Sequence, residues 1–274
     1  MRALLVLSGG AALGLSHLGV YRALAELGVE VAGVVGVSAG AITGALIAAG
    51  FPPAEVERFH RRYRWINLVR PELTSRLGAL SYARMEAELE RTCQVERIEQ
   101  LSLPLVVCCT DVSTAQPVAL SSGPLGRAVR ASCSVPGLFS PVEFEGRFLV
   151  DGGIHSNLPL WATDQVEKDF DLIVASDPIS RLRLPRRPRR YREVLQISFI
   201  LVLKSTTEKV LPPRDPRVVL IQPEMEWVRP VDLGAIDRLM ELGYQEAQRV
   251  LLPLLGGTVP PVERNPDRVI RRGP

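Results

Sequence analysis

The sequence predicts an α/β fold with a mainly parallel central sheet, on three observations. Short apolar runs rich in Val, Leu and Ile alternate along the chain with segments of helical spacing. Two such strand-helix units fall within the first fifty residues, and successive units of this kind place their strands parallel. The chain has 274 residues, 46% of them hydrophobic, which is enough to bury one substantial core. We expect one domain over residues 1–255 and a loose tail, rich in Pro and Arg, over 256–274.

The elements follow from apolar runs and from the breakers between them. Expected strands are residues 3–7, 31–35, 105–110, 117–120, 147–150, 172–176 and 218–221, and expected helices are residues 14–27, 39–49, 126–131, 194–210 and 233–252. Phe51-Pro52-Pro53 ends the second helix. The charged segments of helical spacing that come next predict a helical insertion or cap over about residues 52–100.

Composition excludes several classes of protein. A net charge of +3, spread along the chain, is too small to indicate nucleic-acid binding. The four cysteines form neither a CxxC pair nor a cluster with histidine, which predicts free thiols in a reducing cytoplasm and no metal site. No apolar run approaches the ~20 residues of a membrane-spanning helix, and "LQISFILVL" is stopped by Lys204. We expect a soluble cytoplasmic protein without a cofactor.

A candidate nucleophile lies between the second strand and the second helix. The segment "GVSAG", residues 36–40, places Ser38 between two glycines at a strand-to-helix turn. Glycine on either side permits the close approach of strand and helix that holds a serine hydroxyl out from the sheet. The amide groups at the start of the next helix, that of Ala39 first, point at the serine and stabilise developing negative charge.

A glycine-rich loop follows the first strand. The segment "SGGAALG", residues 8–14, exposes backbone amides and is a candidate oxyanion hole. A phosphate-binding loop is the competing interpretation, because such turns also open nucleotide sites. Neither GxGxxG nor GxxxxGK[ST] fits these residues, and the loop contains no lysine.

The base that would take the proton from Ser38 is not evident among the three histidines. His17 and His60 fall on expected helices, where local hydrogen bonding or a surface position accounts for them. Asp151 follows a strand, precedes two glycines that would let the backbone turn sharply, and lies near His155. Because the ends of strands carry chemistry in α/β sheets, Asp151 is a candidate base. An Asx turn is the alternative role for this carboxylate.

Residues 181–192, "RLRLPRRPRRYR", combine seven arginines with two prolines and contain no acid. The prolines predict neither a packed helix nor a strand. A solvated loop is one interpretation of this stretch. The other is contact with an anionic membrane, with the arginines at the headgroups and Leu182, Leu184 and Tyr191 dipping below them.

Together these motifs resemble those of the patatin-like phospholipases. Four blocks occur in that family's order: "LVLSGGAALGLSHLGVYRAL", "GVSAG", "ASCSVPGLFSP" over residues 131–141, and "DGGIHSNLP" over residues 151–159. The resemblance runs from about Leu4 to the last expected helix, whose "DLGAIDRLMELGYQEA" also looks like the family's end. It implies a three-layer α/β/α fold.

The resemblance also implies a serine lipid acyl hydrolase of the phospholipase A, lysophospholipase or carboxylesterase kind, acting on lipid or ester substrates. Its catalytic groups would be a dyad in which Asp151 takes the proton from Ser38. A carboxylate is a weaker base than imidazole, so the pKa of Asp151 must rise in a desolvated site. The implied oxyanion hole comprises the amides of Gly9, Gly10, Ala11 and Ala39, and the glycines that support the motifs are Gly14, Gly36, Gly40, Gly152 and Gly153.

Two residues depart from the family's pattern. Ala11 replaces the third glycine of the oxyanion motif but keeps a backbone amide, while Leu13 replaces a basic residue. Loss of that cation favours esters in general over phospholipids as substrates. A regulatory or lipid-binding patatin fold with little or no turnover is the alternative function, suggested by Leu13 and by the basic stretch.

Overall fold

The computed structural model describes residues 1–63, 65–72, 77–167, 169–185, 187–188, 190–227 and 235–256. The strands of its central sheet are β1 (Arg2–Leu7), β2 (Glu30–Gly36), β5 (Leu105–Asp111), β6 (Gln116–Leu120), β7 (Val142–Phe144), β8 (Arg147–Asp151), β9 (Leu172–Ser176) and β11 (Val218–Ile221). They lie in the order β11-β9-β1-β2-β5-β8-β7, and β6 also pairs with β5. Two small pairs stand apart, β3 (Arg70–Pro71) with β4 (Leu80–Ser81) and β10 (Leu182–Arg183) with β12 (Met225–Glu226).

The central sheet is mainly parallel, as the sequence predicts. The ladder from β11 through β9, β1 and β2 to β5 is parallel throughout. Beyond this ladder the pairing is antiparallel, since β6 and β8 pair antiparallel with β5 and β7 pairs antiparallel with β8. Short connections turn β5 back into β6 and β7 back into β8, while α6 (Leu125–Ser132) lies between β6 and β7.

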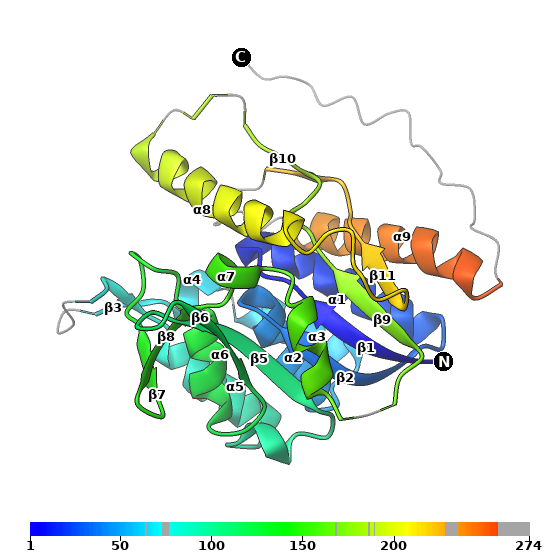
Figure 1. Cartoon of the computed structure of the whole chain (residues 1–274), viewed down its shortest axis with the longest axis horizontal. Coiled ribbons are helices and arrows are strands. Elements are labelled where there is room, and N and C mark those ends of the chain that lie inside the picture. The colour runs from blue at the N-terminus through cyan, green and yellow to red at the C-terminus, as the bar shows by residue number, and fades with distance from the viewer. Residues whose placement is uncertain are drawn as a thin grey trace.

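The helices pack around the central sheet (Figure 1). They are α1 (Ser16–Glu26), α2 (Ala39–Ala48), α3 (Pro53–Arg62), α4 (Trp65–Leu68), α5 (Ala83–Cys93), α6 (Leu125–Ser132), α7 (Gly153–Ser156), α8 (Tyr191–Glu208) and α9 (Ala235–Leu254), with the 3₁₀ segments η1 (Ala11–Leu15), η2 (Ile98–Gln100) and η3 (Leu160–Gln165). The segment expected as a helical cap, residues 52–100, is mostly helical where it is described.

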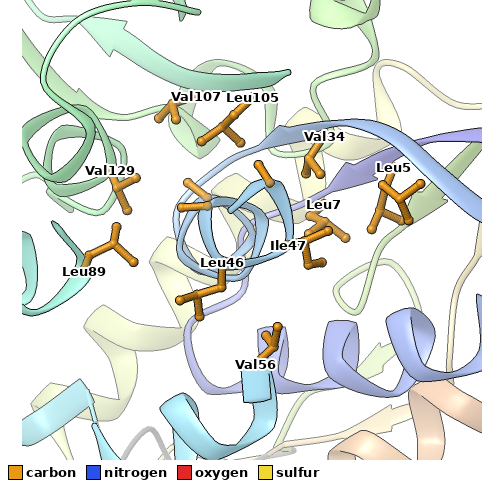
Figure 2. Close-up of a cluster of buried hydrophobic side chains, with 14 of the residues drawn as sticks. Leu5, Leu7, Val34, Leu46, Ile47, Val56, Leu89, Leu105, Val107 and Val129 are labelled. Carbon is orange, nitrogen blue, oxygen red and sulfur yellow. The ribbon is translucent and has the colours of Figure 1, made fainter. Parts of the chain in front are cut away.

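Alternate residues of the strands supply two separate hydrophobic clusters, one on each face of the sheet. On one face Leu5, Leu7, Val34, Leu105 and Val107 pack around α2, which contributes Leu46 and Ile47 (Figure 2). On the other face Leu4, Val6, Val35, Val106 and Cys108 pack with Leu158 and with Ala162 of η3. The sheet is thus buried on both sides, which explains why its strands read as nearly continuous apolar runs.

A third cluster joins α8 and α9 to the glycine-rich loop. Leu13 is buried there with Leu203 of α8 and Leu239 of α9. Figure 1 shows α8, in yellow, lying above α7. Leu13 therefore has a packing role in this chain, at the position where the family's motif has a basic residue.

The stretch 181–192 differs from its prediction. Leu182 and Arg183 form β10, which pairs with β12, and Tyr191 begins α8. Leu182 is buried, and Leu184 is partly buried against the third cluster, so the fold turns Leu182 inward. The strand forms because Pro185 and Pro188 lie beyond these two residues and remove none of their hydrogen bonds.

Two further expectations fall partly on residues outside the described chain. The tail expected over 256–274 lies outside the described residues except for Gly256, and the division into one domain and a tail stays a prediction. The last helix was expected from residue 233, whereas the described part begins at Ala235, the first residue of α9. Among the described residues, no helix combines the length and the apolarity needed to cross a membrane.

Candidate active site

Strand β5 brings the turn that carries Ser38 next to Asp151. Val107 pairs with both Gly36 of β2 and Leu120 of β6, and two residues later Cys109 pairs with both Asp151 of β8 and Val118 of β6. Because β6 occupies one edge of β5 over this length, β2 and β8 share the other edge. The end of β2 and the end of β8 therefore lie two residues apart along the same edge of β5.

Ser38 has a backbone conformation that few residues other than glycine adopt. Its φ and ψ angles are 53° and −120°, directly between the end of β2 and the first residue of α2. A Cβ atom at Gly36 would lie 2.7 Å from the carbonyl oxygen of Gly40, and one at Gly40 would lie 2.3 Å from that of Leu7. The glycines thus permit the close contact of strand and helix that holds Ser38 in this strained, half-buried turn.

The backbone of Ser38 is fixed by a serine that the sequence analysis did not single out. The Ser38 amide donates a hydrogen bond to Ser132 Oγ (2.8 Å), and the Ser132 hydroxyl donates in turn to the carbonyl oxygen of Cys108 on β5 (2.7 Å). Ser132 belongs to the "ASCSVPGLFSP" block, which gives that block a definite role. It ties the serine turn to the strand that also pairs with Asp151.

Asp151 lies at the end of β8 and its carboxyl group is buried, with only 1% of the residue exposed. Oδ1 accepts a hydrogen bond from the Gly153 amide (2.8 Å), which is the Asx-type contact considered as an alternative role. Oδ2 is buried without a partner of good hydrogen-bond geometry among the described residues. One oxygen therefore fixes the loop while the other remains available.

Burial raises the pKa of the Asp151 carboxyl group from 3.8 to about 6. The hydrogen bond from the Gly153 amide and the nearby Ser38 hydroxyl both lower it, but less strongly. A carboxyl group with a pKa near 6 is mostly ionised at neutral pH and is a stronger base than an exposed aspartate. The Ser38 hydroxyl is thus close enough to Asp151 to affect its ionisation.

The two glycines after Asp151 are required by packing, and the turn that they begin is helical. Gly152 has ordinary helical angles, φ −67° and ψ −20°. A Cβ atom at Gly152 would lie 2.4 Å from the carbonyl oxygen of Cys108, and one at Gly153 would lie 2.5 Å from Leu203 Cδ2. The missing side chains let this loop fit between β5 and α8.

The glycine-rich loop lies against the serine turn. A Cβ atom at Gly9 would lie 3.2 Å from Ser38 Cβ, and one at Gly14 would lie 2.6 Å from Ala39 Cβ. The Gly9 amide donates to the carbonyl oxygen of Asn157 (3.4 Å), whereas no partner is recorded within the described chain for the amides of Gly10, Ala11 and Ala39. Ala11 is exposed and has a φ of 48°, which a glycine would adopt without strain.

Asn157 links the segments that carry the site, and its importance was not recognised in the sequence. Its Nδ2 group donates to the carbonyl oxygen of Gly9 (3.4 Å) and to Thr207 Oγ1 of α8 (3.3 Å), and its amide donates to Thr206 Oγ1 (3.2 Å). Thr206 Oγ1 also donates to the carbonyl oxygen of Gly153 (2.9 Å). The position of Asn157 inside "DGGIHSNLP" was the only available signal.

The histidines occupy other positions. His17 is buried, with Nδ1 2.8 Å from Ser176 Oγ and Nε2 2.9 Å from the carbonyl oxygen of Ser8, and burial lowers its pKa to about 4. His60 Nε2 lies 3.1 Å from Thr43 Oγ1, and desolvation likewise lowers its pKa to about 4. His155 is exposed on α7. Both ring nitrogens of His17 already have partners, so His17 has no free nitrogen to take the proton from Ser38.

Among the described residues, the candidate site coincides neither with a metal-binding cluster nor with either of two surface hollows. All four cysteines are buried free thiols, and the described residues contain no group of three or more His, Cys, Asp or Glu placed to hold a metal ion. Of two surface hollows, one of about 190 Å³ is lined by charged residues of α1, α3 and α9, and another of about 270 Å³ lies beside residues 98–106. Neither of these two includes Ser38 or Asp151.

Known proteins resemble this chain in sequence. A family model described as "Patatin-like phospholipase" matches residues 5–164. An uncharacterized NTE family protein of Mycobacterium tuberculosis is 34% identical over 182 residues, which cover 64% of this chain and 49% of the relative. Patatin-like phospholipase domain-containing protein 6 of Homo sapiens is 29% identical over 276 residues, covering 90% of this chain and 20% of that protein. This chain thus spans about half the length of its mycobacterial relatives.

Two solved structures have a similar fold at low sequence identity. VipD from Legionella pneumophila has a TM-score of 0.51 at 16% identity, over 91% of this chain and 66% of its own. The type III effector protein ExoU has a TM-score of 0.50 at 16% identity, over 93% of this chain and 53% of its own. These likenesses concern the fold alone, and they agree with the α/β architecture predicted from the sequence.

Proposed function

The chain belongs to the patatin-like phospholipase family, a family of lipid hydrolases, and from this premise we propose that it is a serine acyl hydrolase that cleaves carboxylic esters of lipids. Ser38 is the nucleophile and Asp151 is the base. The observation that carries this proposal is the buried Oδ2 oxygen of Asp151, which has no geometrically good partner and belongs to a carboxyl group whose pKa the Ser38 hydroxyl lowers.

The reaction proceeds in two halves. Ser38 Oγ attacks the carbonyl carbon of the ester while its proton passes to Asp151, and the tetrahedral intermediate collapses as Asp151 returns that proton to the leaving alcohol. The product of this half is an acyl-Ser38 ester. A water molecule then attacks the acyl group, giving a proton to Asp151, and collapse of the second intermediate releases the acid as the proton returns to Ser38.

Backbone amides stabilise the negative oxygen in both halves of the reaction. Gly10, Ala11 and Ala39 are the proposed donors, because their amides have no recorded partner in the described chain. Gly9 also belongs to the oxyanion hole predicted from the sequence, but its amide donates to the carbonyl oxygen of Asn157. The Gly9 amide must give up this hydrogen bond before it can donate to the negative oxygen of the intermediate. The start of α2 at Ala39 adds the favourable field of a helix N-terminus.

Turnover of a fluorogenic short-chain ester tests this function directly. The wild-type chain should hydrolyse the ester, and Ser38→Ala should abolish hydrolysis while leaving the fold intact by circular dichroism. Hydrolysis that persists in Ser38→Ala would assign the activity to another group. A short-chain ester dissolves as a monomer, so this assay requires no lipid surface.

A regulatory or lipid-binding protein with little turnover is the second candidate function. The positive φ of Ala11 favours it, because strain in the oxyanion loop disfavours the arrangement that catalysis requires. The same ester assay separates the two functions. A well-folded wild-type chain that hydrolyses no ester and binds lipid vesicles would support the second candidate.

We also propose peripheral contact with anionic membranes through residues 181–192. Arg187 and Arg190 are exposed and form no recorded ion pair with other described residues, whereas Arg183 pairs with Glu224. Each cation near an anionic surface adds roughly 1 kcal/mol of binding. Sedimentation with anionic vesicles should therefore fall as salt screens the charges, and Arg187→Gln with Arg190→Gln should weaken it at low salt.

A further inference from the structure

Helix α8 carries an apolar stripe that no described part of the chain covers. The stripe consists of Tyr191, Val194, Leu195, Leu201 and Val202, whose exposed fractions are 76%, 46%, 46%, 49% and 42%. From Tyr191 the other four lie three, four, ten and eleven residues along, which places them on one side of a helix of 3.6 residues per turn. The position between its halves is Ser198, which is exposed and uncharged.

The C-terminal part of the same helix contacts the candidate active site. Leu203 packs beside Gly153, and Thr206 Oγ1 donates to the Gly153 carbonyl oxygen (2.9 Å) in the loop that follows Asp151. Leu203 also shares a buried cluster with Leu13 of the glycine-rich loop. One helix thus joins an outward apolar surface to both loops that supply the proposed chemistry.

We propose that the stripe on α8 is the face by which this protein lies on the surface of an anionic lipid aggregate. The proposal rests on the lipid hydrolase function above and adds to it the surface that meets the substrate. Charge complementarity identifies the occupant: the twelve residues 181–192, which lead into α8, contain seven arginines and no acid. An apolar stripe that continues from a basic segment suits the boundary between anionic headgroups and acyl chains.

This assignment changes which residues insert below the headgroups. Leu182 of the basic segment is buried and Leu184 is partly buried, so Tyr191 is the most exposed of the three apolar side chains named for insertion. The other apolar side chains come from α8 itself, one and three turns further along. Arg190, which is exposed and directly precedes Tyr191, then lies beside the inserted stripe and contacts headgroups.

Vesicle binding tests the proposal independently of catalysis. The double variant Leu195→Ser with Leu201→Ser, made in a Ser38→Ala background, is sedimented with vesicles of phosphatidylcholine and phosphatidylserine at a 4:1 ratio. Loss of two partly exposed leucines should weaken binding at least ~10-fold at both low and high salt. The matched control is Leu254→Ser, a 56% exposed leucine at the end of α9, which should bind as the parent does.

Activity measurements add a second readout and separate the two proposals. With Ser38 present, the double variant should keep its turnover of a soluble short-chain ester and lose at least ~10-fold on an ester carried in the same vesicles. If no ester is hydrolysed, the catalytic proposal fails while the binding result still decides the stripe.

Two outcomes would overturn the proposal. The first is undiminished vesicle binding by the double variant at an unchanged midpoint of thermal unfolding. The second is a dimer of the parent chain, seen by analytical ultracentrifugation without lipid, that the double variant converts to a monomer. That second result would assign the stripe to another copy of this chain.

Discussion

Gly36 at the end of β2 pairs with Val107 of β5, and Asp151 at the end of β8 pairs with Cys109 on the same edge of β5. The ends of β2 and β8 therefore lie two residues apart along β5. The turn holding Ser38 begins just beyond Gly36. A carboxylate from an antiparallel strand thereby reaches the serine turn of a parallel sheet. This geometry supports the proposal of Asp151 as the base, since His17 is buried with both ring nitrogens bonded.

Removing the base should be nearly as damaging as removing the nucleophile. Asp151→Asn keeps the size of the side chain and an acceptor for the Gly153 amide, but it cannot take a proton from Ser38. We expect kcat on a soluble ester to fall on the order of 10³-fold or more, close to the loss in Ser38→Ala. His155→Ala should retain most activity, and the opposite ranking of these two variants would identify histidine as the base.

The pH dependence of catalysis should report the raised pKa of Asp151. If the ionised carboxylate is the active form, as proposed, kcat/KM should be level above pH 7 and fall about tenfold per unit well below an apparent pKa of about 6. His155→Ala, measured from pH 4.5 to 8, is the control and should give the same midpoint. A profile that stays level down to pH 4.5 would remove Asp151 from the role of base.

The same shift makes the ionised carboxylate a cost to stability. The folded pKa of about 6 exceeds the ordinary 3.8, so the folded chain binds this proton more tightly and loses stability as pH rises from about 4 to 6. Asp151→Asn should therefore raise the free energy of unfolding at pH 8 by up to ~3 kcal/mol. Urea unfolding should show that this gain disappears near pH 4, and a gain that grows toward low pH would contradict the sign.

Ala11 offers a separate test of the glycine-rich loop. Its φ of 48° is a conformation that costs an L-residue ~1 to 2 kcal/mol, whereas glycine adopts it freely. Ala11→Gly should raise the free energy of unfolding by ~1 kcal/mol. The neighbouring Ala12→Gly has no positive φ to relieve and should lower it, so equal effects of both variants in urea unfolding would remove strain as the explanation.

Local sequence patterns were sufficient for the main elements of the fold. The strand predicted over residues 31–35 is β2 at Glu30–Gly36, and the helix predicted over 39–49 is α2 at Ala39–Ala48, because apolar runs and the glycines between them mark both. The two-residue strand β10 was missed since its partner β12 lies more than forty residues away. The outward stripe of α8 was also invisible, because "LQISFILVL" is apolar on every side of the helix.

The sequence likewise marks some residues of the candidate site but not others. Short patterns of glycine around a reactive side chain mark Ser38 and Asp151 in the sequence, and their catalytic roles stay predictions. Ser132 and Asn157 were not predicted, because their hydrogen bonds join segments that only the folded sheet brings together. The packing role of Leu13 likewise depends on α8 and α9, which lie far along the chain.

The nucleophile itself can be tested by covalent labelling. A fluorophosphonate reacts with an activated serine hydroxyl and leaves an adduct whose mass is measured on the intact protein. The account predicts one adduct on the wild-type chain, assigned to Ser38 by peptide mapping, with none on Ser38→Ala and slowed labelling of Asp151→Asn. A folded wild-type chain that forms no adduct, or forms it at another residue, would contradict the assignment of Ser38.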